Sequence, residues 1–267
     1  MSGHDQAEAW RELQAGLRGL RPEPPPTLRP AVLERVGLAD AFIPVEGPAG
    51  PLLVAYNGRG ISATAPAGDE AGFVARFLAR HRRPLRPAGQ PPARLLAQLR
   101  RYIDPTAGGA PPRFDLRGVS EFERAVLDKT AEIPRGEVRP YAWVAGEIGR
   151  PAAVRAVGGA LNRNPVPVLI PCHRVVGSDG ALTGYAWGLP YKRTLLAAEG
   201  ADPAELERLG RGRTRYLGSD ATRVYCYPTC HNARRIGPAH RVAFRDAGAA
   251  AAAGYRPCRR CRPPAVG

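Results

Sequence analysis

The sequence lacks the long apolar runs that a membrane protein needs. Its 267 residues hold no stretch approaching the roughly 20 consecutive apolar residues of a membrane-spanning helix. The first ten residues, MSGHDQAEAW, also lack the basic and then apolar pattern of a secretory signal. With 44% hydrophobic residues, the chain can still bury a core. We therefore expect a folded, cytoplasmic protein with no membrane partner.

The chain has fewer acidic than basic residues. The chain has 24 Asp and Glu against 39 Lys and Arg, which gives a formal net charge of +15. Such an excess of positive charge favours a polyanionic partner, and nucleic acid is the usual one. The chain is also rich in Ala, Arg, Gly and Pro, so many Arg residues could instead be ordinary solvated surface residues. Charge alone leaves both interpretations open.

Cysteine is scarce as well. There are five in total, and four form two closely spaced pairs, Cys226 with Cys230 and Cys258 with Cys261. This spacing is typical of a structural zinc site, in which four thiolates surround the ion tetrahedrally. Paired cysteines in a cytoplasmic chain favour metal over disulfides, although two redox-active or disulfide-bonded pairs are the alternative. We predict one Zn²⁺ bound by these four cysteines.

The cysteine pairs belong to a small C-terminal module, residues 216–267, which follows an expected linker over residues 201–215. Between residues 213 and 262 there are eleven Arg and two Asp, so this region has a net charge of 11 − 2 = +9. The module has few large apolar residues. A bound metal would therefore supply much of its folding free energy.

The N-terminal part is predicted to be an extension followed by an α+β domain. Residues 1–38 are polar to Pro-rich, with an expected helix over 7–20 and a linker or cap at 21–30. In the domain over 39–115, two alternating stretches flank Asn57-Gly58, a dipeptide typical of tight β-hairpins. The expected elements are strands at 51–56 and 60–65, helices at 70–80 and 92–103, and a Gly/Pro-rich break at 105–112.

Residues 116–200 are predicted to form a second, helical domain. Ser120 and Glu123 have the spacing of a capping box, in which each side chain binds the other residue's backbone N–H at a helix start. Farther on, two short helices joined by a glycine-containing turn predict a helix-turn-helix-like unit. The expected helices begin near 120, cover 141–148, run from about 151 to 162, and cover 190–199.

The fifth cysteine, Cys172, is followed directly by His173. A thiol becomes a good nucleophile only when ionised, and a neighbouring imidazole can take its proton, directly or through water. Glu199, at the end of the last helix of this domain, could orient that imidazole, as the third member of a catalytic triad does. An isolated cysteine can equally be a buried, inert core residue. The dipeptide alone leaves both interpretations open.

The surroundings of Cys172 resemble a known family. Residues 155–200 contain an Asn-Pro turn, a PCHRV box, a Gly-Tyr segment and a helix ending in Glu-Gly, in that order. This pattern closely resembles the O6-alkylguanine-DNA alkyltransferases, and the likeness covers residues 40–200. The resemblance implies an α+β fold with a ribonuclease-H-like N-terminal domain and a winged-helix-like alkyltransferase domain. It also implies a monomer of the bacterial cytosol and nucleoid that repairs O6-alkylguanine, and O4-alkylthymine, in double-stranded DNA.

Carried over by position, the resemblance implies a role for each matching residue. Cys172 would be the alkyl acceptor, with His173 as its base through a bridging water. Glu199 would orient both, Asn164 would brace the turn, and Tyr141 would stabilise the leaving guanine. The residues that would contact DNA are Arg155, Ala156, Gly159 and Tyr141. The residues that would line the alkyl pocket are Tyr185, Val175 and Trp187.

The helix near 151–162 is rich in Ala and Gly, including the pair Gly158-Gly159. An adduct on guanine O6 lies inside the duplex, so the nucleotide must be flipped out to be reached. Small side chains would let this helix enter the minor groove, and Arg155 would fill the place of the flipped base. The same small residues would also suit helix–helix packing. The thioether product could not be cleaved by any residue here, so the protein would act once.

Two features depart from the family patterns. Tyr185 is followed by Ala186-Trp187-Gly188 where many members have Gly-Gly, which leaves the accepted adduct size open. The C-terminal module resembles the metal-binding domain of the Ada methyl-response protein, whose first cysteine accepts methyl from a DNA methylphosphotriester. That residue corresponds to Cys226. Tyr227 stands where the Ada pattern usually has Arg, so a purely structural zinc module that grips DNA is the alternative.

Two other functions fit parts of the sequence. A methylation-triggered transcription regulator would need an AraC-type DNA-binding region, and residues 1–38 are too few and too Pro-rich to form one. A non-catalytic lesion-binding protein, of the alkyltransferase-like kind, has another residue in place of the box cysteine. The presence of Cys172 therefore favours chemistry over binding alone.

Overall fold

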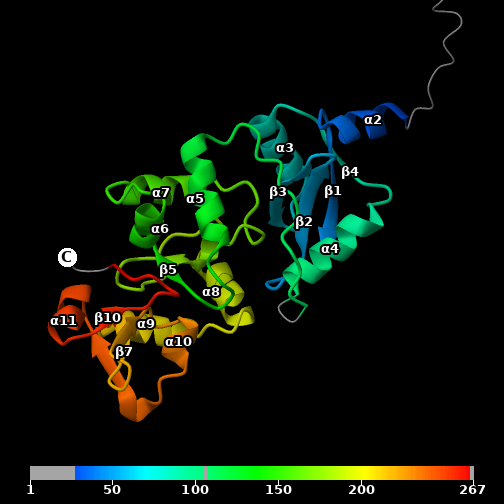
Figure 1. The fold of residues 1–267 in the computed structure, drawn as a ribbon. Helices are drawn as coiled ribbons and strands as arrows, with labels where there is room; N and C mark the ends of the chain where they lie inside the picture. The colour runs from blue at the N-terminus through cyan, green and yellow to red at the C-terminus, as the bar shows by residue number, and fades with distance from the viewer. Residues whose placement is uncertain (1–27, 105–106, 265–267) are drawn as a thin grey trace, which may run out of the picture.

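The first structural unit is a four-stranded mixed sheet with strand order β3-β2-β1-β4. The computed structural model describes residues 28–104 and 107–264 (Figure 1). β1 pairs antiparallel with β2 and parallel with β4, while β2 and β3 form an antiparallel hairpin. The strands are β1 (Asp40–Val45), β2 (Leu52–Asn57), β3 (Gly60–Pro66) and β4 (Leu85–Pro87).

Helices cover both faces of this sheet, so its strands are buried on both sides. Alternate residues such as Phe42 and Leu53 pack with buried phenylalanines of α3 (Glu70–His81). Their neighbours along the same strands pack with Leu99 of α4 (Ala93–Ile103). Figure 1 shows the two helices on opposite sides of the strands. No helix in the described ranges is long and apolar enough to cross a membrane.

The local sequence signals of this unit are largely confirmed. The hairpin turns at Asn57-Gly58, and α3 and α4 fall within one residue of their expected bounds. β4 escaped prediction because it has only three residues and buries only Leu85. The N-terminal helix α2 (Leu28–Val36) begins inside the expected linker. The helix expected over 7–20 lies outside the described residues.

The second unit is mainly helical. The capping box of α5 is confirmed, because Ser120 Oγ accepts from the Glu123 N–H (3.3 Å) and Glu123 Oε2 accepts from the Ser120 N–H (3.1 Å). A short parallel sheet joins two segments that lie far apart in sequence. The elements are α5 (Glu121–Ala131), β5 (Arg139–Pro140), α6 (Tyr141–Glu147), α7 (Val154–Asn162), β6 (Val175–Val176) and α8 (Leu189–Ala198).

α6 and α7 are the two short helices expected to follow each other through a turn. Gly149 supplies the turn with a left-handed backbone (φ +70°), which glycine adopts without strain. α7 begins about three residues later than expected. Residues 151–153 form a turn instead, and Ala153 at the helix start has no side chain that can cap the helix.

The N-terminal sheet holds the segment that leads to Cys172. Thr64 on β3 donates two hydrogen bonds to this segment. Its N–H donates to the carbonyl of Pro165 (3.0 Å), and its hydroxyl donates to the carbonyl of Pro167 (2.7 Å). The hydroxyl of Tyr102 on α4 donates to the carbonyl of Leu169 (2.9 Å). The first unit therefore fixes the backbone of the loop in which Cys172 lies.

The segment expected to be a linker contains a helix, α9 (Pro203–Arg211). The side chain of Asp202 caps it by accepting from the N–H groups of Ala204 and Glu205, and Leu206 is buried. Asp followed by Pro is a recognised helix start, so the signal was present in the sequence. The linker predicted over 201–215 thus contains a helix.

The C-terminal module contains a second four-stranded sheet, with order β10-β8-β7-β9. Its core is aromatic, with edge-on contacts between Tyr216 and Tyr225 and between Phe244 and Tyr255. Figure 1 shows the module beside the helical unit, away from the N-terminal sheet. Its elements are β7 (Tyr216–Ser219), β8 (Val224–Cys226), α10 (His231–Arg234), β9 (Arg241–Phe244), α11 (Ala247–Ala252) and β10 (Arg256–Pro257).

Candidate active site and metal centre

Cys172 lies in a buried and tightly braced turn. It begins the 3-10 turn Cys172–Arg174 and is 8% exposed. Asn164 Nδ2 donates to the carbonyl of Ile170 (2.9 Å) and lies 3.4 Å from the Cys172 sulfur. Asn164 Oδ1 accepts from the N–H of Val166 (3.0 Å). The Asn164 amide thus closes the turn and directs one N–H toward the sulfur.

His173 and Glu199 form a buried pair beside Cys172. His173 Nε2 lies 3.0 Å from Glu199 Oε1, and the histidine side chain is fully buried. Arg174, to which the sequence analysis assigned no role, binds the same carboxylate through Nε (2.9 Å) and Nη2 (2.6 Å). Within the described residues, His173 Nδ1 is buried without a hydrogen-bond partner. With Nε2 turned to the carboxylate, Nδ1 is the nitrogen available for proton transfer.

Burial governs the ionisation of these groups. Burial raises the pKa of the Cys172 thiol, against smaller opposing effects of the Asn164 hydrogen bond and the Lys192 charge. Burial also lowers the pKa of His173, although Glu199 opposes this. For Glu199, burial disfavours ionisation, but hydrogen bonds from His173 and Arg174 outweigh it and lower the pKa to about 2. The resting site holds a thiol and a carboxylate, so a proton must leave before the sulfur can react.

Lys192 on α8 is a site residue that the sequence analysis missed. It is fully buried, and its Nζ donates to the carbonyls of Val175 (2.6 Å) and Thr183 (2.9 Å). Burial lowers the pKa of Lys192 to about 8. Lys192 precedes the buried Leu195 and Leu196 by three and four residues, which places it on the inward face of the helix. That spacing was the available signal.

Three aromatic residues lie together where the alkyl pocket was expected. The Tyr185 and Trp187 rings meet edge-on at 5.9 Å, and Trp187 meets Tyr191 edge-on at 5.2 Å. The Tyr185 hydroxyl is buried without a partner in the described part of the chain. Burial, and then the charge of a Cys172 thiolate, raise the Tyr185 pKa, so ring and sulfur share one environment.

Tyr141 and Val175 reach the same region from the short sheet. Tyr141 is the first residue of α6, directly after β5, and its hydroxyl interacts with Thr183. Burial, and more weakly Cys172, raise the Tyr141 pKa. Val175 is fully buried in β6, and its carbonyl accepts from Lys192. Tyr141 therefore lies in the electrostatic environment of Cys172, and Val175 is linked to Lys192.

Three of the four expected DNA-contacting residues lie on the outer face of α7, whereas Tyr141 is a partly buried residue of α6. Arg155 and Ala156 are exposed and Gly159 is partly exposed, while Val157, Ala160 and Leu161 face the core. A Cβ atom on Gly158 would lie 3.9 Å from Tyr141, its nearest neighbour. On Gly159 it would lie 3.5 Å from the Arg163 side chain. The fold itself therefore has room for a side chain at both glycines.

The four paired cysteines converge on one point in the C-terminal module. Their sulfur atoms all lie within 4.8 Å of one another, every one is buried, and none forms a disulfide. Zn–S bonds of about 2.3 Å give sulfur separations of about 3.8 Å in a tetrahedron, so this arrangement suits zinc. Asn232 Nδ2 lies 3.4 Å from the Cys258 sulfur and supports it. Four buried cysteines this close, with no disulfide among them, are consistent with a metal site.

Cys226 also lines an open groove on the module. The groove has a volume of about 480 Å³, and none of the other three cysteines belongs to its described lining. Basic and hydroxyl groups surround it, namely Arg235, Arg256, His240, Ser219 and Thr222. These are groups that bind phosphate oxygens.

Comparisons with known proteins agree with both sites. Residues 121–201 match the family model described as the DNA-binding domain of 6-O-methylguanine DNA methyltransferase. Residues 213–264 match the metal-binding domain of Ada. Neither model reaches residues 28–104, which hold the N-terminal sheet.

Individual relatives extend the match toward the N-terminus. A methylated-DNA–protein-cysteine methyltransferase of Methanosarcina barkeri is 40% identical over 159 residues, 58% of this chain and 94% of the relative. One from Mycolicibacterium paratuberculosis is 54% identical over 86 residues, which span 32% of this chain and about half of that relative (52%). The crystal structure of Mycobacterium tuberculosis OGT in complex with DNA aligns with a TM-score of 0.50 and 31% identity, covering 62% of this chain and 99% of that one.

Proposed function

This chain belongs to the O6-methylguanine-DNA methyltransferase family and carries a metal-binding domain of the Ada type, and we propose that Cys172 is its alkyl acceptor. It is a methylated-DNA–protein-cysteine methyltransferase of DNA repair. One observation carries the assignment of Cys172. Its sulfur lies 3.4 Å from Asn164 Nδ2 and is followed in the chain by a histidine whose Nε2 is held by Glu199.

The buried pair explains how the thiol can ionise. Because Nε2 of His173 faces Glu199, Nδ1 takes the proton of Cys172 through a bridging water. The imidazolium that forms is stabilised by the Glu199 carboxylate. Asn164 and Lys192 favour the thiolate, the first by a hydrogen bond and the second by its charge. A buried thiolate is poorly solvated, which keeps it reactive.

The chemical step is an in-line displacement at the alkyl carbon. The thiolate forms a carbon–sulfur bond while the carbon–O6 bond breaks, and the electron pair passes to the guanine ring. The guanine then takes up a proton and leaves as the neutral base, with Tyr141 stabilising it. The thioether on Cys172 is permanent, so one protein molecule repairs one lesion. We include O4-alkylthymine among its substrates.

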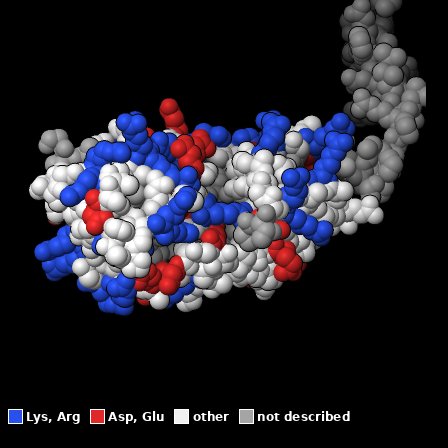
Figure 2. Space-filling model, turned by 60° about the horizontal axis from the view of Figure 1, so that its bottom comes forward, with Lys and Arg blue, Asp and Glu red and all other residues white. Residues whose placement is uncertain are grey.

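Helix α7 is proposed to enter the minor groove of double-stranded DNA. Arg155 would occupy the space of the flipped nucleotide, with Ala156 and Gly159 against the groove. Two adjacent glycines cost a helix up to about 1 kcal/mol each relative to alanine. Packing within the fold does not require them, which supports close approach to DNA. Figure 2 shows basic side chains spread over one face of the molecule, with smaller acidic groups between them.

The domain assignment follows the same proposal. We assign residues 39–115 as a ribonuclease-H-like domain and 116–200 as a winged-helix-like alkyltransferase domain. Residues 1–38 precede them as an extension. Residues 216–267 form an Ada-type module, which α9 joins to the alkyltransferase domain.

Alkyl transfer to Cys172 can be tested directly. The full chain is incubated with duplex DNA that carries radiolabelled O6-methylguanine, and the label is mapped to a peptide. We expect one label per protein on Cys172 and none in the Cys172→Ser variant, because a serine hydroxyl does not ionise near neutral pH. Folded protein that binds the lesion tightly but leaves the label on DNA would instead be a lesion-binding protein.

We propose zinc as the metal and Cys226 as a second methyl acceptor. Zinc keeps a bound thiolate nucleophilic without a separate base. Cys226 lies at a groove whose basic side chains suit a backbone phosphate. Methyl transfer there would remove negative charge from the module and strengthen its binding to DNA. Tyr227, in place of the usual Arg, lies buried in the module rather than at this groove.

The second acceptor requires its own experiment. The zinc-loaded full chain is exposed to DNA whose only methyl groups are backbone methylphosphotriesters, and peptides are weighed by mass spectrometry. We expect the Cys226 peptide to gain the mass of one CH₂ group and the Cys172 peptide to keep its mass. If the Cys226 peptide of the zinc-bound chain stays unmodified, the module is a structural unit that binds DNA without accepting methyl groups.

A further inference from the structure

The C-terminal module binds the backbone of the loop between α5 and α6. Arg234, at the end of α10, donates to the carbonyl of Gly136. Thr229 Oγ1 accepts from the N–H of Val138 (2.8 Å), and the N–H of His231 donates to the Glu137 side chain (3.2 Å). The three module residues flank Cys230 in the sequence. A short stretch of the module therefore holds residues 136–138 at three successive positions.

The same loop contacts Glu199. The N–H of Gly136 lies 3.4 Å from Glu199 Oε2. Gly136 has a left-handed backbone (φ +68°), and a Cβ there would lie 2.6 Å from the Glu199 carbonyl oxygen and 3.1 Å from Arg234 Nη2. Gly136 is thus enclosed between the carboxylate residue that orients His173 and an arginine of the module.

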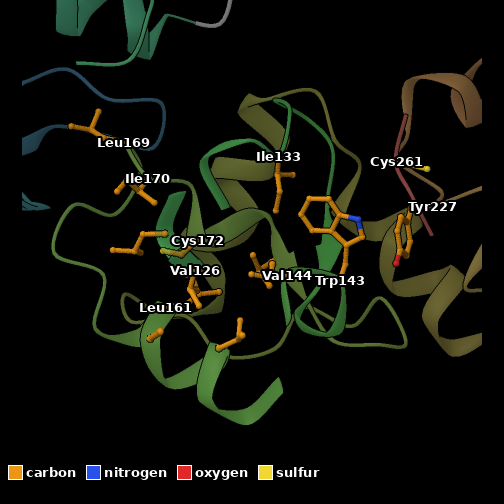
Figure 3. Packing of buried hydrophobic residues seen from close by; sticks show 14 of the residues in the cluster. Val126, Ile133, Trp143, Val144, Leu161, Leu169, Ile170, Cys172, Tyr227 and Cys261 are labelled. Carbon is orange, nitrogen blue, oxygen red and sulfur yellow. The ribbon is translucent and has the colours of Figure 1, made fainter. Parts of the chain in front are cut away.

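The interface also contains buried charged residues, together with one ion pair whose arginine is half exposed. Glu137 and Arg139 form an ion pair of 2.5 Å with side chains about 4% and 3% exposed, and Arg139 lies over the ring of Tyr227 at 5.4 Å. Arg262 binds Glu147 on α6 at 2.6 Å. Figure 3 shows buried side chains of one cluster, which extends from Cys172 past Trp143 to Tyr227 and Cys261.

We propose that Arg234 is a positioning residue for alkyl transfer, acting through Gly136 on Glu199. The C-terminal module is then a structural support of the Cys172 site as well as a separate DNA-binding unit. This inference rests on the proposed role of Cys172 as acceptor.

The physical argument concerns orientation. Without Arg234, the Gly136 carbonyl loses its charged donor and the loop gains freedom. The Gly136 N–H then restrains Glu199 less well, and His173 depends on that carboxylate for its orientation. Arg174 still pairs with the Glu199 carboxylate, so the charge balance of the site is unchanged. What changes is the position of Glu199 relative to His173. Misplacement by about 1 Å can cost a reaction up to about a hundredfold, and we expect about a tenfold loss here.

The test uses the zinc-loaded full chain and three variants, Arg234→Ala, Arg234→Lys and Arg245→Ala. Arg245 is an exposed arginine of the same module and controls for the lost charge. Single-turnover methyl transfer is measured at saturating O6-methylguanine duplex between pH 6 and 9, with DNA affinity measured separately. We expect Arg234→Ala to react about tenfold more slowly, with the rising limb of its pH profile moved to lower pH, because a misplaced Glu199 stabilises the imidazolium less and so lowers the pKa of His173, the base. Arg234→Lys should recover most of the rate, and Arg245→Ala should retain it.

Equal rates and pH profiles for Arg234→Ala and Arg245→Ala would overturn the proposal. If Arg234→Ala does not fold, Thr229→Val is the deciding variant, because it removes the one hydroxyl that accepts from the Val138 N–H and donates to the Val138 carbonyl. An unchanged rate in that variant overturns the proposal, and a several-fold loss supports it. A wild-type chain that transfers no methyl group to Cys172 would instead refute the proposed function itself.

Discussion

At the scale of single residues, the Cys172 site surrounds a buried thiol with partners that favour its ionisation. Burial alone would keep the thiol protonated, since it raises the pKa of Cys172 and lowers that of His173. The structure counters this with fixed partners, an amide N–H on the sulfur and a carboxylate on the imidazole. In the proposed reaction, the flipped base would enter a buried pocket, and these partners would let a thiolate form inside it.

Glu199 should contribute to stability as well as to catalysis, with a defined pH dependence. Its pKa falls from an ordinary value of 4.5 to about 2 in the folded chain. A carboxyl with a depressed folded pKa adds stability above its unfolded pKa and loses it as pH falls through the folded value. Glu199→Gln should therefore lower the free energy of unfolding by about 3 kcal/mol at pH 7, as expected for a broken buried pair.

The pH dependence of that difference provides the check. Urea unfolding of wild type and Glu199→Gln is compared between pH 7 and pH 2.5. The gap in unfolding free energy should be constant above about pH 5 and shrink as pH falls from 4.5 toward 2. A gap that does not change with pH would mean that the ion pair with His173 and Arg174 contributes nothing.

Trp187 should restrict the size of the alkyl group. Its indole meets Tyr185 and Tyr191 edge-on, and the family pattern has glycine in this region. Trp187→Ala should raise the rate with O6-benzylguanine DNA relative to O6-methylguanine DNA by about tenfold, because the added space admits an aromatic adduct. Single-turnover rates on the two duplexes measure the ratio, with Trp187→Phe as the intermediate case. An unchanged ratio would place the size limit elsewhere.

At the scale of secondary structure, α7 presents its smallest residues outward. Ala156→Leu adds bulk at an exposed position, so the fold should tolerate it, while DNA binding should weaken by about tenfold, or about 1.4 kcal/mol. Fluorescence anisotropy with a short duplex measures the affinity, and thermal unfolding confirms the fold. Ala197→Leu, the same change at an exposed position of α8, serves as the control. Equal affinities in the two variants would contradict the placement of α7 in the groove.

What the sequence predicted at this scale depended on short-range signals. The hairpin at Asn57-Gly58 and the capping box of Ser120 and Glu123 are each encoded within a few residues, and both are confirmed. The pattern around Cys172, from the Asn-Pro turn to the helix ending in Glu-Gly, likewise pointed to the site, although the Cys172-His173 dipeptide alone did not. Short-range signals of this kind predict the structure correctly where no tertiary contact favours another conformation.

The features that escaped prediction depend on contacts between distant segments. Lys192 is recognisable as a site residue only once the carbonyls of Val175 and Thr183 are brought to it. Arg174 gains its role from Glu199, 25 residues away. The contact between Arg234 and Gly136 joins positions 98 residues apart, and neither local sequence predicts it.

At the scale of the whole molecule, the Cys172 turn and the four-cysteine centre share one buried core. The core runs from the Cys172 turn through Trp143 to Tyr227 and Cys261, so the C-terminal module is packed against the helical unit (Figure 3). On the functions proposed above, one centre would act on the bases of DNA and the other on its backbone. A basic chain with a net charge of +15 would hold both against DNA.

Metal removal should unfold the module and leave the N-terminal sheet intact. A four-thiolate zinc site contributes about 10 kcal/mol or more to the folding of a small domain, far above what this module's small core supplies. In the zinc-loaded chain the amide of Cys258 is held by the Tyr225 carbonyl (2.9 Å) and should exchange slowly with deuterium. After chelation under reducing conditions it should exchange at least a hundredfold faster, while amides of β2, such as that of Val54, keep their protection. Cys258→Ser should behave like the chelated chain and Cys172→Ser like wild type, because only the first removes a ligand. A metal-free, reduced module that stayed protected would owe its stability to packing alone, and its cysteines would need another explanation.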